Sequence, residues 1–344
     1  MNCYLSRNYK NLDGAGNKAK TDIEKIMERA GFRNVGLKQS NFTNPVLDFL
    51  FTLFGVLKSP FYLHENDILF LQYPLKKYFS FVCKLAHFRN SKVVVIIHDL
   101  GCFRRKKLTV EKEIRRLNRA DYIIAHNPSM KAFLLQNGCK ARIGELGIFD
   151  YLAVAPVTEV IGPCPPFNVV YAGALSERKN KFLYELGSYI HSYIFRLFGN
   201  GFESSKAIEN ERLNYHGFIS SEQMIAHPQG HFGLVWDGAS IHTCSGNFGE
   251  YLRYNNPHKT SFYLRCGMPV IIWKQAALAS FIERNGAGFC IESLEEIDNI
   301  LKSLTSEDYR KLKENACKIG MKLSKGHFIT EALKTAEREL VAGN

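Results

Sequence analysis

The sequence lacks the short motifs that mark several large enzyme classes. It contains no G-x-x-x-x-G-K-[ST] loop, no G-x-S-x-G turn and no D-x-D pair. The first motif cradles nucleotide phosphates in P-loop kinases and NTPases, and the second presents the nucleophilic serine of α/β hydrolases. Their absence argues against both classes. No set of residues has the spacing of metal ligands either, so we expect neither a resident metal nor a cofactor.

Long hydrophobic runs and paired cysteines are also missing. The longest apolar stretch, F-L-F-T-L-F-G-V-L at 49–57, is far shorter than the ~20 residues of a membrane-spanning helix. The chain opens with M-N-C-Y-L-S-R-N, which has no signal-peptide pattern. Its nine cysteines are scattered without a C-x-x-C pair, which disfavours a disulfide framework or a structural zinc site. We therefore expect a cytoplasmic protein, peripheral to a membrane at most.

What the sequence has in excess is positive charge. Its 344 residues carry a net charge of +12, which favours nucleic acid, an anionic membrane face or phosphorylated substrates as partners. Because the basic residues are spread through the chain without an aromatic-basic reader motif, we expect no nucleic-acid partner. The most basic stretch is 104–119, where Lys112, Arg115, Arg116 and Arg119 share one helix face. A solvated face and an anionic membrane contact both fit this stretch.

Strand and helix patterns alternate along the chain, and 344 residues suggest two domains. Apolar, β-branched segments interrupted by helical patterns indicate parallel sheets covered on both faces. A proline-rich linker at 155–166 separates the halves. We expect burial of 49–57 in the core, with a lipid site as the alternative, and helix breaks at Gly320 and Gly326. The expected strands are 67–74, 92–99, 120–127, 167–173, 190–198, 213–218, 232–236, 270–273 and 288–291, and the clearest helices are 18–30, 109–119 and 306–341.

The segment Y-N-N-P-H-K at 254–259 reads as a helix start directed at an anion. Asn256 can cap the helix, Pro257 fits its first position and Gly267 suits the position just past its end. Lys259 then lies in the first turn, where the helix dipole already favours negative charge. Since a cation is misplaced there, we expect an anionic ligand to compensate it.

Other candidates in the second half follow predicted strands. Ligands bind at the carboxyl ends of parallel strands, so Gly173, Arg178 and Lys179 predict a phosphate site beside Lys259. Surface cations at a helix start are the alternative. The segment 215–217, comprising Tyr215, His216 and Gly217, ends another strand, and either holds a nucleobase or forms a packing cluster.

In the first half, two features can carry chemistry. Gly14 and Gly16 form a G-x-G-x-x-A turn at a helix start, which is either a phosphate-binding turn or a plain glycine turn. His98 and Asp99 end a predicted strand, where a carboxylate or imidazole facing substrate is a candidate general base. A capping or hydrogen-bonded Asp is the alternative, and Asp237 and Glu250 are further candidate carboxylates.

The block 249–273 (G-E-Y-L-R-Y-N-N-P-H-K-T-S-F-Y-L-R-C-G-M-P-V-I-I-W) resembles a family of bacterial sugar-nucleotide transferases. This family includes β-1,6-galactofuranosyltransferases and the third glucosyltransferase of streptococcal adhesin glycosylation. The segments L-Q-Y-P at 71–74 and I-I-H-D at 96–99, and A-G-A-L with the following R-K, resemble it too. The resemblance implies a metal-independent GT-B fold, with two Rossmann-like parallel-sheet domains at 1–155 and 156–325 and a final segment, 326–344, that returns to the first domain.

The resemblance also implies roles for individual residues. A UDP-sugar would be held by the second domain and a saccharide acceptor by the first. Arg178 and Lys259 would bind the diphosphate, and 215–217 would lie near the uridine. Asn17 and the glycine turn would approach the leaving group, and homo-oligomers are expected. The remaining donor-site candidates of the 254–259 block are Tyr254, Asn255, Asn256 and His258, of which Asn255 or Asn256 would contact the phosphate or sugar.

We therefore expect a glycosyltransferase that moves a hexose, galactofuranose in the favoured hypothesis, to an acceptor hydroxyl with inversion. The alternatives are a glucosyltransferase that extends a glycan on a protein and a non-catalytic nucleotide-sugar-binding subunit.

Overall fold

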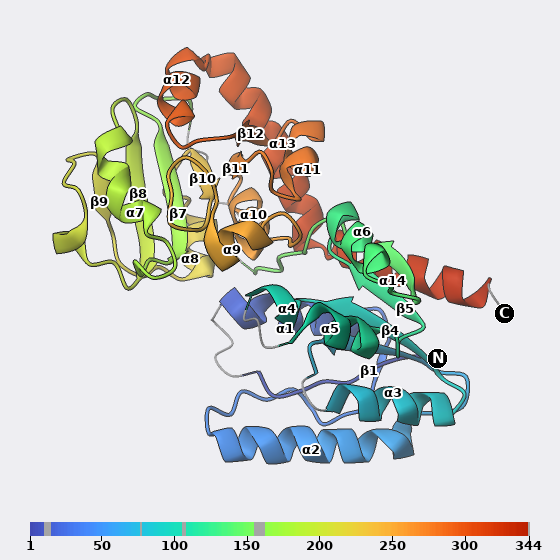
Figure 1. The fold of residues 1–344 in the computed structure, drawn as a ribbon. Helices are drawn as coiled ribbons and strands as arrows, with labels where there is room; N and C mark the ends of the chain where they lie inside the picture. Colours follow the sequence, from blue (N-terminus) through green and yellow to red (C-terminus); the bar gives the residue numbers. More distant parts are fainter. Residues whose placement is uncertain (10–14, 76–77, 105–107, 155–161, 343–344) are drawn as a thin grey trace. The chain divides into compact units, whose positions relative to one another are not determined.

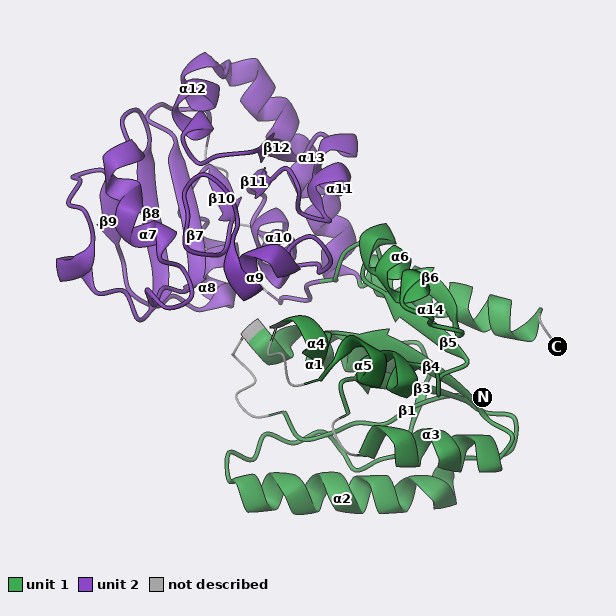
Figure 2. Cartoon of the chain, viewed as in Figure 1, with its two compact units in different colours: residues 1–150, 326–344 green, residues 151–325 purple. Residues whose placement is uncertain are grey.

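The computed structural model describes residues 1–9, 15–75, 78–104, 108–154 and 162–342. The chain divides into two compact units, each with its own parallel sheet (Figure 2). Unit 1 comprises residues 1–150 together with 326–344, and unit 2 comprises 151–325. The first part of the expected linker, 155–161, lies outside the described residues, and so does Gly14.

The sheet of unit 1 has the strand order β2-β1-β3-β4-β5-β6, and its ladders are parallel (Figure 1). Its centre is an apolar run, Val93 to Ile97, whose side chains are fully buried. Burial on both faces is what a continuous β-branched strand in a parallel sheet requires. The strands are β1 (Asn2–Tyr4), β2 (Arg33–Asn34), β3 (Ile68–Tyr73), β4 (Lys92–Ile97), β5 (Tyr122–Ala125) and β6 (Arg142–Glu145).

The helices of unit 1 include the last helix of the chain. This helix packs against β5, β6 and the first helix. It begins after Gly326, whose φ of +74° ends the preceding helix as expected. The Asp150 carboxylate accepts hydrogen bonds from the backbone N–H groups of Ile329 (2.6 Å) and Phe328 (3.3 Å) in its first turn. The helices are α1 (Ala15–Arg29), α2 (Pro45–Tyr62), α3 (Phe79–Phe88), α4 (Gly101–Arg104), α5 (Val110–Leu117), α6 (Pro128–Gln136) and α14 (His327–Val341).

The expectation that 49–57 is buried in the core is wrong for most of its large side chains. The segment lies in α2, and Phe54 and Leu57 are exposed. Gly55 and Ser59 face inward instead, and a Cβ on Gly55 would lie 3.5 Å from the backbone nitrogen of Leu37. The helix therefore packs through small residues and turns its large apolar residues outward.

The sheet of unit 2 has the order β12-β11-β10-β7-β8-β9, also with parallel ladders. The strand expected at 190–198 begins later, at Ile194, and a 3-10 helix at 186–189 precedes it. Gly233 on the central strand makes room for the Tyr263 ring, because a Cβ there would lie 2.1 Å from a ring carbon. The Tyr263 hydroxyl in turn accepts a hydrogen bond from the backbone N–H of Ala172 (2.8 Å). The strands are β7 (Asn168–Ala174), β8 (Ile194–Asn200), β9 (Leu213–Tyr215), β10 (Phe232–Val235), β11 (Val270–Trp273) and β12 (Gly288–Ile291).

The longest helix of unit 2, α13, runs through Gly320 without the expected break. A Cβ on Gly320 would lie 2.4 Å from the carbonyl oxygen of Leu264, so this glycine allows close packing of α13 on α10. The helical elements are α7 (Phe182–Glu185), η2 (Leu186–Tyr189), η3 (Ser204–Lys206), α8 (Ser221–Ala226), α9 (Gly246–Tyr251), α10 (His258–Arg265), α11 (Ala279–Arg284), α12 (Glu296–Ser303) and α13 (Ser306–Ser324).

Candidate functional site

The carboxyl ends of β7 and β10 and the start of α10 bring cationic residues together within unit 2. Strand β7 ends beside Gly173, whose φ is +148°. A Cβ at this glycine would lie 3.7 Å from Cε of Lys259, so the lysine side chain crosses the strand end in contact with its backbone. Gly173 and Lys259 therefore lie together, as expected, whereas their roles in binding a ligand stay a prediction.

The ends of α10 agree only partly with expectation. The helix begins at His258, and its N-cap is Pro257 rather than Asn256, a residue whose side chain has no group to make a capping hydrogen bond. Proline therefore lies one position outside the helix. The other end is confirmed: Gly267 has φ +68°, and the backbone N–H of Met268 donates to the Tyr263 carbonyl (2.9 Å), which is the Schellman arrangement.

Lys259 is compensated from within the protein. Its Nζ lies 2.9 Å from Oδ1 of Asp237 and donates to the Tyr171 hydroxyl at 2.7 Å. The same hydroxyl donates to Oδ1 of Asp237 at 3.0 Å. Asp237 is buried after β10, and the Lys259 side chain is 16% exposed. In the free protein Lys259 does not need an external anion as counter-charge, because Asp237 supplies one, and the expected anionic ligand stays a prediction.

Burial and the neighbouring charges shift the pKa values of Lys259 and Asp237 in this cluster. Burial lowers the pKa of Lys259 to about 8, with Asp237 opposing this shift and Lys179 adding to it. For Asp237, burial disfavours the charged form, but the attraction of Lys259 and Lys179 outweighs it, so the pKa lies below the usual value. Asp237 is therefore ionised at neutral pH, and Lys259 changes charge in a mildly alkaline range.

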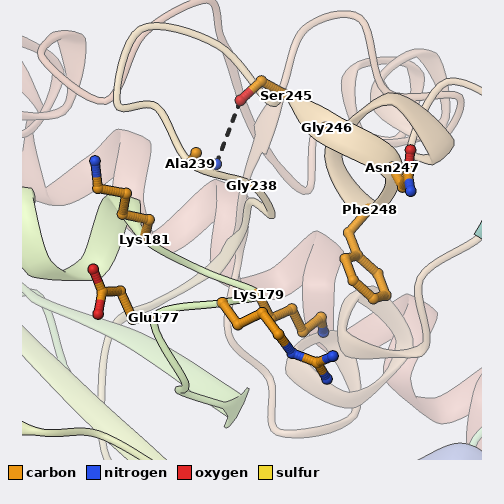
Figure 3. A pocket seen from close by; sticks show the side chains of 10 residues that line it. Glu177, Lys179, Lys181, Gly238, Ala239, Ser245, Gly246, Asn247 and Phe248 are labelled. Carbon is orange, nitrogen blue, oxygen red and sulfur yellow. Dashed lines mark hydrogen bonds between the residues drawn. The ribbon is translucent and has the colours of Figure 1, made fainter.

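A pocket of about 550 Å³ opens beside this cluster (Figure 3). Arg178 and Lys179 line it, as expected of a phosphate site. Lys179 Nζ lies 3.6 Å from Oδ1 of Asp237 and 5.5 Å from the centre of the Phe248 ring. Lys179 of the pocket wall and Lys259 thus share one carboxylate. The other lining residues are Glu177, Lys181, Gly238, Ala239, Ser245, Gly246 and Asn247.

The segment 215–217 lies at the end of β9, two strands from β7 along the same sheet edge. Gly173 pairs with Gly199 in the β7–β8 ladder, and the Tyr215 hydroxyl donates to the Gly199 carbonyl at 3.0 Å. The His216 ring stacks on Phe198 at 4.9 Å, and Gly217 has φ +73°. Tyr215 remains 42% exposed, so its ring is both packed and accessible to a ligand.

The other residues of the 254–259 block differ in their surroundings. Asn256 is buried, and the buried side-chain oxygen of Asn255 has no hydrogen-bond partner in the described part of the chain. The His258 ring stacks on Tyr151 at 4.7 Å. Tyr254 is half-buried, and its N–H donates to the Tyr251 carbonyl. Asn255 is therefore the block residue with unmet hydrogen-bonding capacity.

In unit 1, His98 and Asp99 follow β4, and both are half-buried. His98 Nε2 lies 2.7 Å from Oε1 of Gln72, whose amide nitrogen donates to the Tyr9 hydroxyl (3.2 Å). Because Gln72 uses its amide nitrogen as a donor, its oxygen faces His98, and the proton of the neutral imidazole lies on Nε2. Tyr9 donates to Glu24 at 2.5 Å, and burial raises the pKa of Glu24 to about 7. A chain of hydrogen bonds thus links His98 to a buried carboxyl.

The glycine turn is described only from residue 15 onward. Gly16 and Asn17 lie in the first turn of α1, and a Cβ on Gly16 would meet no atom of the described residues within 4 Å. Asn17 accepts a hydrogen bond from Lys20 at 3.3 Å. The described residues therefore do not require glycine at 16, and Gly14 lies outside them.

Comparisons with known proteins show which family this chain belongs to. Models of the glucosyltransferase 3-like N-terminal and C-terminal domains match residues 2–148 and 169–336. The chain belongs to the glucosyltransferase 3-like family. It is 36% identical over 276 residues, 79% of each chain, to β-1,6-galactofuranosyltransferase WbbI of Escherichia coli K12. It is 24% identical over 335 residues, 94% of each chain, to glucosyltransferase 3 of Streptococcus gordonii.

The fold of this family member is similar to solved glycosyltransferases. A glycosyltransferase of Rickettsia africae superposes with a TM-score of 0.57 at 12% identity, over 98% of this chain and 99% of that one. The expected GT-B fold is therefore confirmed, and the chain is a glycosyltransferase. Within the described ranges, no helix combines the length and the apolar character needed to cross a bilayer.

Sequence reasoning missed part of the site of this glycosyltransferase. Tyr171 lies inside a strand pattern, where a buried aromatic residue predicts core packing, so nothing marked its contact with Lys259. The pocket wall around Ser245 had a usable signal, since S-G-N-F-G follows the β10 strand at the edge where ligands bind. Glu250, a weaker candidate, pairs with Arg253 at 2.9 Å.

Proposed function

We propose that this glycosyltransferase transfers galactofuranose from a UDP-sugar to a saccharide acceptor in cell-surface polysaccharide synthesis. The observation that carries the proposal is the cationic pocket at the carboxyl ends of β7 and β10, which Arg178 and Lys179 line, with Lys259 beside it on the same carboxylate as Lys179. The 36% identity to a named galactofuranosyltransferase supports the choice of sugar.

The chemistry assigned to the pocket is stabilisation of a leaving diphosphate. Arg178 offers a planar fork of donors and the lysines offer compact charges, so together they match a pyrophosphate. Charges that are already in place lower the barrier as negative charge develops on the leaving group. We propose that this makes a divalent ion unnecessary. Undiminished transfer in EDTA is the expected result, and loss that magnesium restores contradicts it.

The acceptor hydroxyl needs a base, and we propose Asp99 or His98. The hydroxyl oxygen attacks the anomeric carbon from the face opposite the phosphate, which inverts its configuration. The new C–O bond forms as the bond to the β-phosphate breaks, UDP keeps the electron pair, and the proton goes to the base. Asp99→Asn should keep UDP affinity and lose turnover, whereas retained turnover would transfer the role to His98 or another group.

Lys259→Ala tests the pocket. Replacing a cation that contacts the diphosphate is expected to weaken UDP binding by tenfold or more, since charge-assisted contacts contribute roughly 1.5–3 kcal/mol. Calorimetric UDP titration measures this, with Lys274→Ala as the matched control, because Lys274 pairs with Glu292 on the surface. Equal UDP affinity in Lys259→Ala and the wild type contradicts the proposal.

A second candidate function is glucosyl transfer to a glycan on a protein. It is supported by the longer alignment, 94% of each chain, to glucosyltransferase 3 of Streptococcus gordonii. Purified protein given an acceptor and either UDP-galactofuranose or UDP-glucose distinguishes the two by which donor releases UDP. If neither donor gives acceptor-dependent UDP release although the protein binds UDP measurably, the result favours a non-catalytic subunit instead.

The setting we propose is the cytoplasm, at the inner face of the membrane, with the enzyme as a homo-oligomer. Its acceptor then lies on that face. Fractionation of cells and light scattering of the purified enzyme test these two points separately.

A further inference from the structure

Helix α2 lies at the outer edge of unit 1 (Figure 1), and several of its large apolar side chains are exposed. At about 100° per residue, six large apolar side chains fall within an arc of roughly 100°. We call these six residues the α2 stripe. Its members, with their exposed fractions, are Val46 (62%), Leu47 (48%), Leu50 (38%), Phe54 (57%), Leu57 (48%) and Phe61 (80%).

The large apolar residues of this helix lie on its exposed face, which is the reverse of a helix that covers a sheet. Such a helix buries its large apolar residues and exposes polar ones. Here Gly55, Val56 and Ser59 are buried, and the bulk of the apolar side chains is outside. Large apolar side chains gathered on one exposed helix face are a feature of interaction sites.

The charged residues around the α2 stripe are arranged asymmetrically. Lys58 falls at the edge of the arc, about 20° beyond Leu47, whereas Asp48 lies roughly opposite its centre. Asp48 is engaged there by the Asn8 amide at 3.0 Å. Arg89, exposed, donates to the Pro60 carbonyl at 3.2 Å at the far end of the helix. Apolar contact with cations beside it is the pattern of a helix that lies in an anionic lipid surface.

A second copy of this chain fits the stripe less well. From Val46 to Phe61 the helix is about 22 Å long and about 10 Å wide, a footprint on the order of 220 Å². A stable protein interface needs about 800 Å² from each partner. Lipid has no such threshold, because binding strength increases with each apolar group inserted.

We propose that the α2 stripe inserts into the headgroup region of an anionic lipid bilayer and holds the enzyme at the membrane surface. This docking site is separate from the residues assigned to donor binding and catalysis. Expected binding is reversible, since a helix that lies in the interface buries only one face. The stripe, rather than the basic helix α5, is then the main membrane contact.

Vesicle co-sedimentation of the full chain tests the proposal. The double variant Phe54→Ser/Phe61→Ser should lose at least tenfold in affinity for vesicles of 30% phosphatidylglycerol in phosphatidylcholine. The matched control is Ile208→Ser/Met321→Ser, which removes two exposed apolar residues from unit 2 and should bind as the wild type does. UDP binding of both variants should be unchanged, which verifies that they fold.

Three results would overturn the proposal. They are absence of wild-type binding to anionic vesicles, equal binding by the double variant, and equal binding to pure phosphatidylcholine. Self-association of the wild type that the double variant abolishes, without vesicle binding, assigns the stripe to a second copy instead. A failed UDP experiment leaves these readouts intact, since none of them depends on the donor site.

Tryptophan fluorescence gives a direct readout of depth. The two native tryptophans, Trp236 and Trp273, are fully buried, so a new surface tryptophan is distinguishable. Phe54→Trp should shift to the blue and be quenched by brominated lipid on binding anionic vesicles. Ile208→Trp should do neither, and an unshifted Phe54→Trp contradicts insertion.

Discussion

The sharpest prediction concerns the pH dependence of nucleotide binding through Lys259. Burial lowers the pKa of this lysine to about 8 in the free protein. A diphosphate placed beside its Nζ favours the charged form and raises that pKa, so binding UDP takes up a proton where the free lysine is neutral. Affinity should therefore be constant below the free pKa and fall as pH rises through about 8.

The magnitude follows from the fraction of charged lysine. With a pKa of about 8, roughly nine-tenths of Lys259 is protonated at pH 7 and roughly one-tenth at pH 9. UDP affinity should then drop about tenfold between these pH values, or about 1.4 kcal/mol. The phosphate itself adds little, since its second pKa of about 6 leaves it ionised across this range.

Calorimetry at pH 7, 8 and 9 measures the UDP affinity. Repeating the titration in buffers of different ionisation enthalpy measures the number of protons taken up on binding, which should be about half a proton per UDP at pH 8. Lys259→Arg stays charged throughout and should flatten the profile. Lys181→Arg, at an exposed lysine of the same pocket, should leave the tenfold drop in place. Asp237→Asn removes the counter-charge and should move the midpoint below pH 8. A drop that survives in Lys259→Arg refutes the reasoning.

Three further predictions follow from the fold. Glu24→Gln should remove a pH-dependent loss of stability. Burial raises the pKa of Glu24 from 4.5 to about 7, so the stabilising contribution of this carboxyl is present below pH 4.5 and is lost as pH rises through 7. The loss amounts to up to about 3 kcal/mol and is measured by comparing urea midpoints at pH 5 and 8. Gly320→Ala should destabilise by roughly 1–3 kcal/mol in the same assay despite the better helix propensity of alanine, because the new methyl group would lie 2.4 Å from the Leu264 carbonyl oxygen, and a stable variant contradicts this packing. Gly16→Ala should leave the urea midpoint unchanged, since its Cβ meets no atom within 4 Å in the part of the chain that the structure describes, and a loss of transfer activity at constant stability would show that a ligand approaches this backbone.

Most of the two-sheet framework could be predicted because its signals are local and continuous. The β-branched run Lys92–Ile97 predicts a strand buried on both faces, and the structure has it there. Gly267 and Gly326 predict helix ends, and both have positive φ. Gly320 has the same local signature but is explained by contact with α10, which is distant in sequence. The glycine pattern therefore predicted the helix ends at Gly267 and Gly326 correctly and the break at Gly320 wrongly, because a distant packing contact explains that glycine.

Helix α2 shows a second limit of sequence reasoning. A stretch of large apolar residues predicts burial in the core when the chain is assumed to have no external binding partner. The outward orientation of Phe54 depends on which face carries the small residues Gly55 and Ser59, and on a packing partner near Leu37. A helical wheel of 45–62 separates the small from the large residues, so the pattern was present, but only the tertiary contact decides which face is inside.

The Lys259 cluster shows why the position of a site is easier to predict than its electrostatics. The α/β pattern puts Gly173, Lys179 and Lys259 at one sheet edge, and the structure agrees. The counter-charge could not be assigned in the same way, because Asp237 follows a different strand and its direction depends on the Tyr171 hydroxyl. A ligand entering this pocket does not meet bare cations. It must exchange places with a carboxylate that the lysines already hold, so affinity depends on the difference between a diphosphate and Asp237 as partners. One carboxylate offers at most a single negative charge to two lysines, so the free cluster keeps a net positive charge, whereas UDP brings two or more negative charges that can neutralise it.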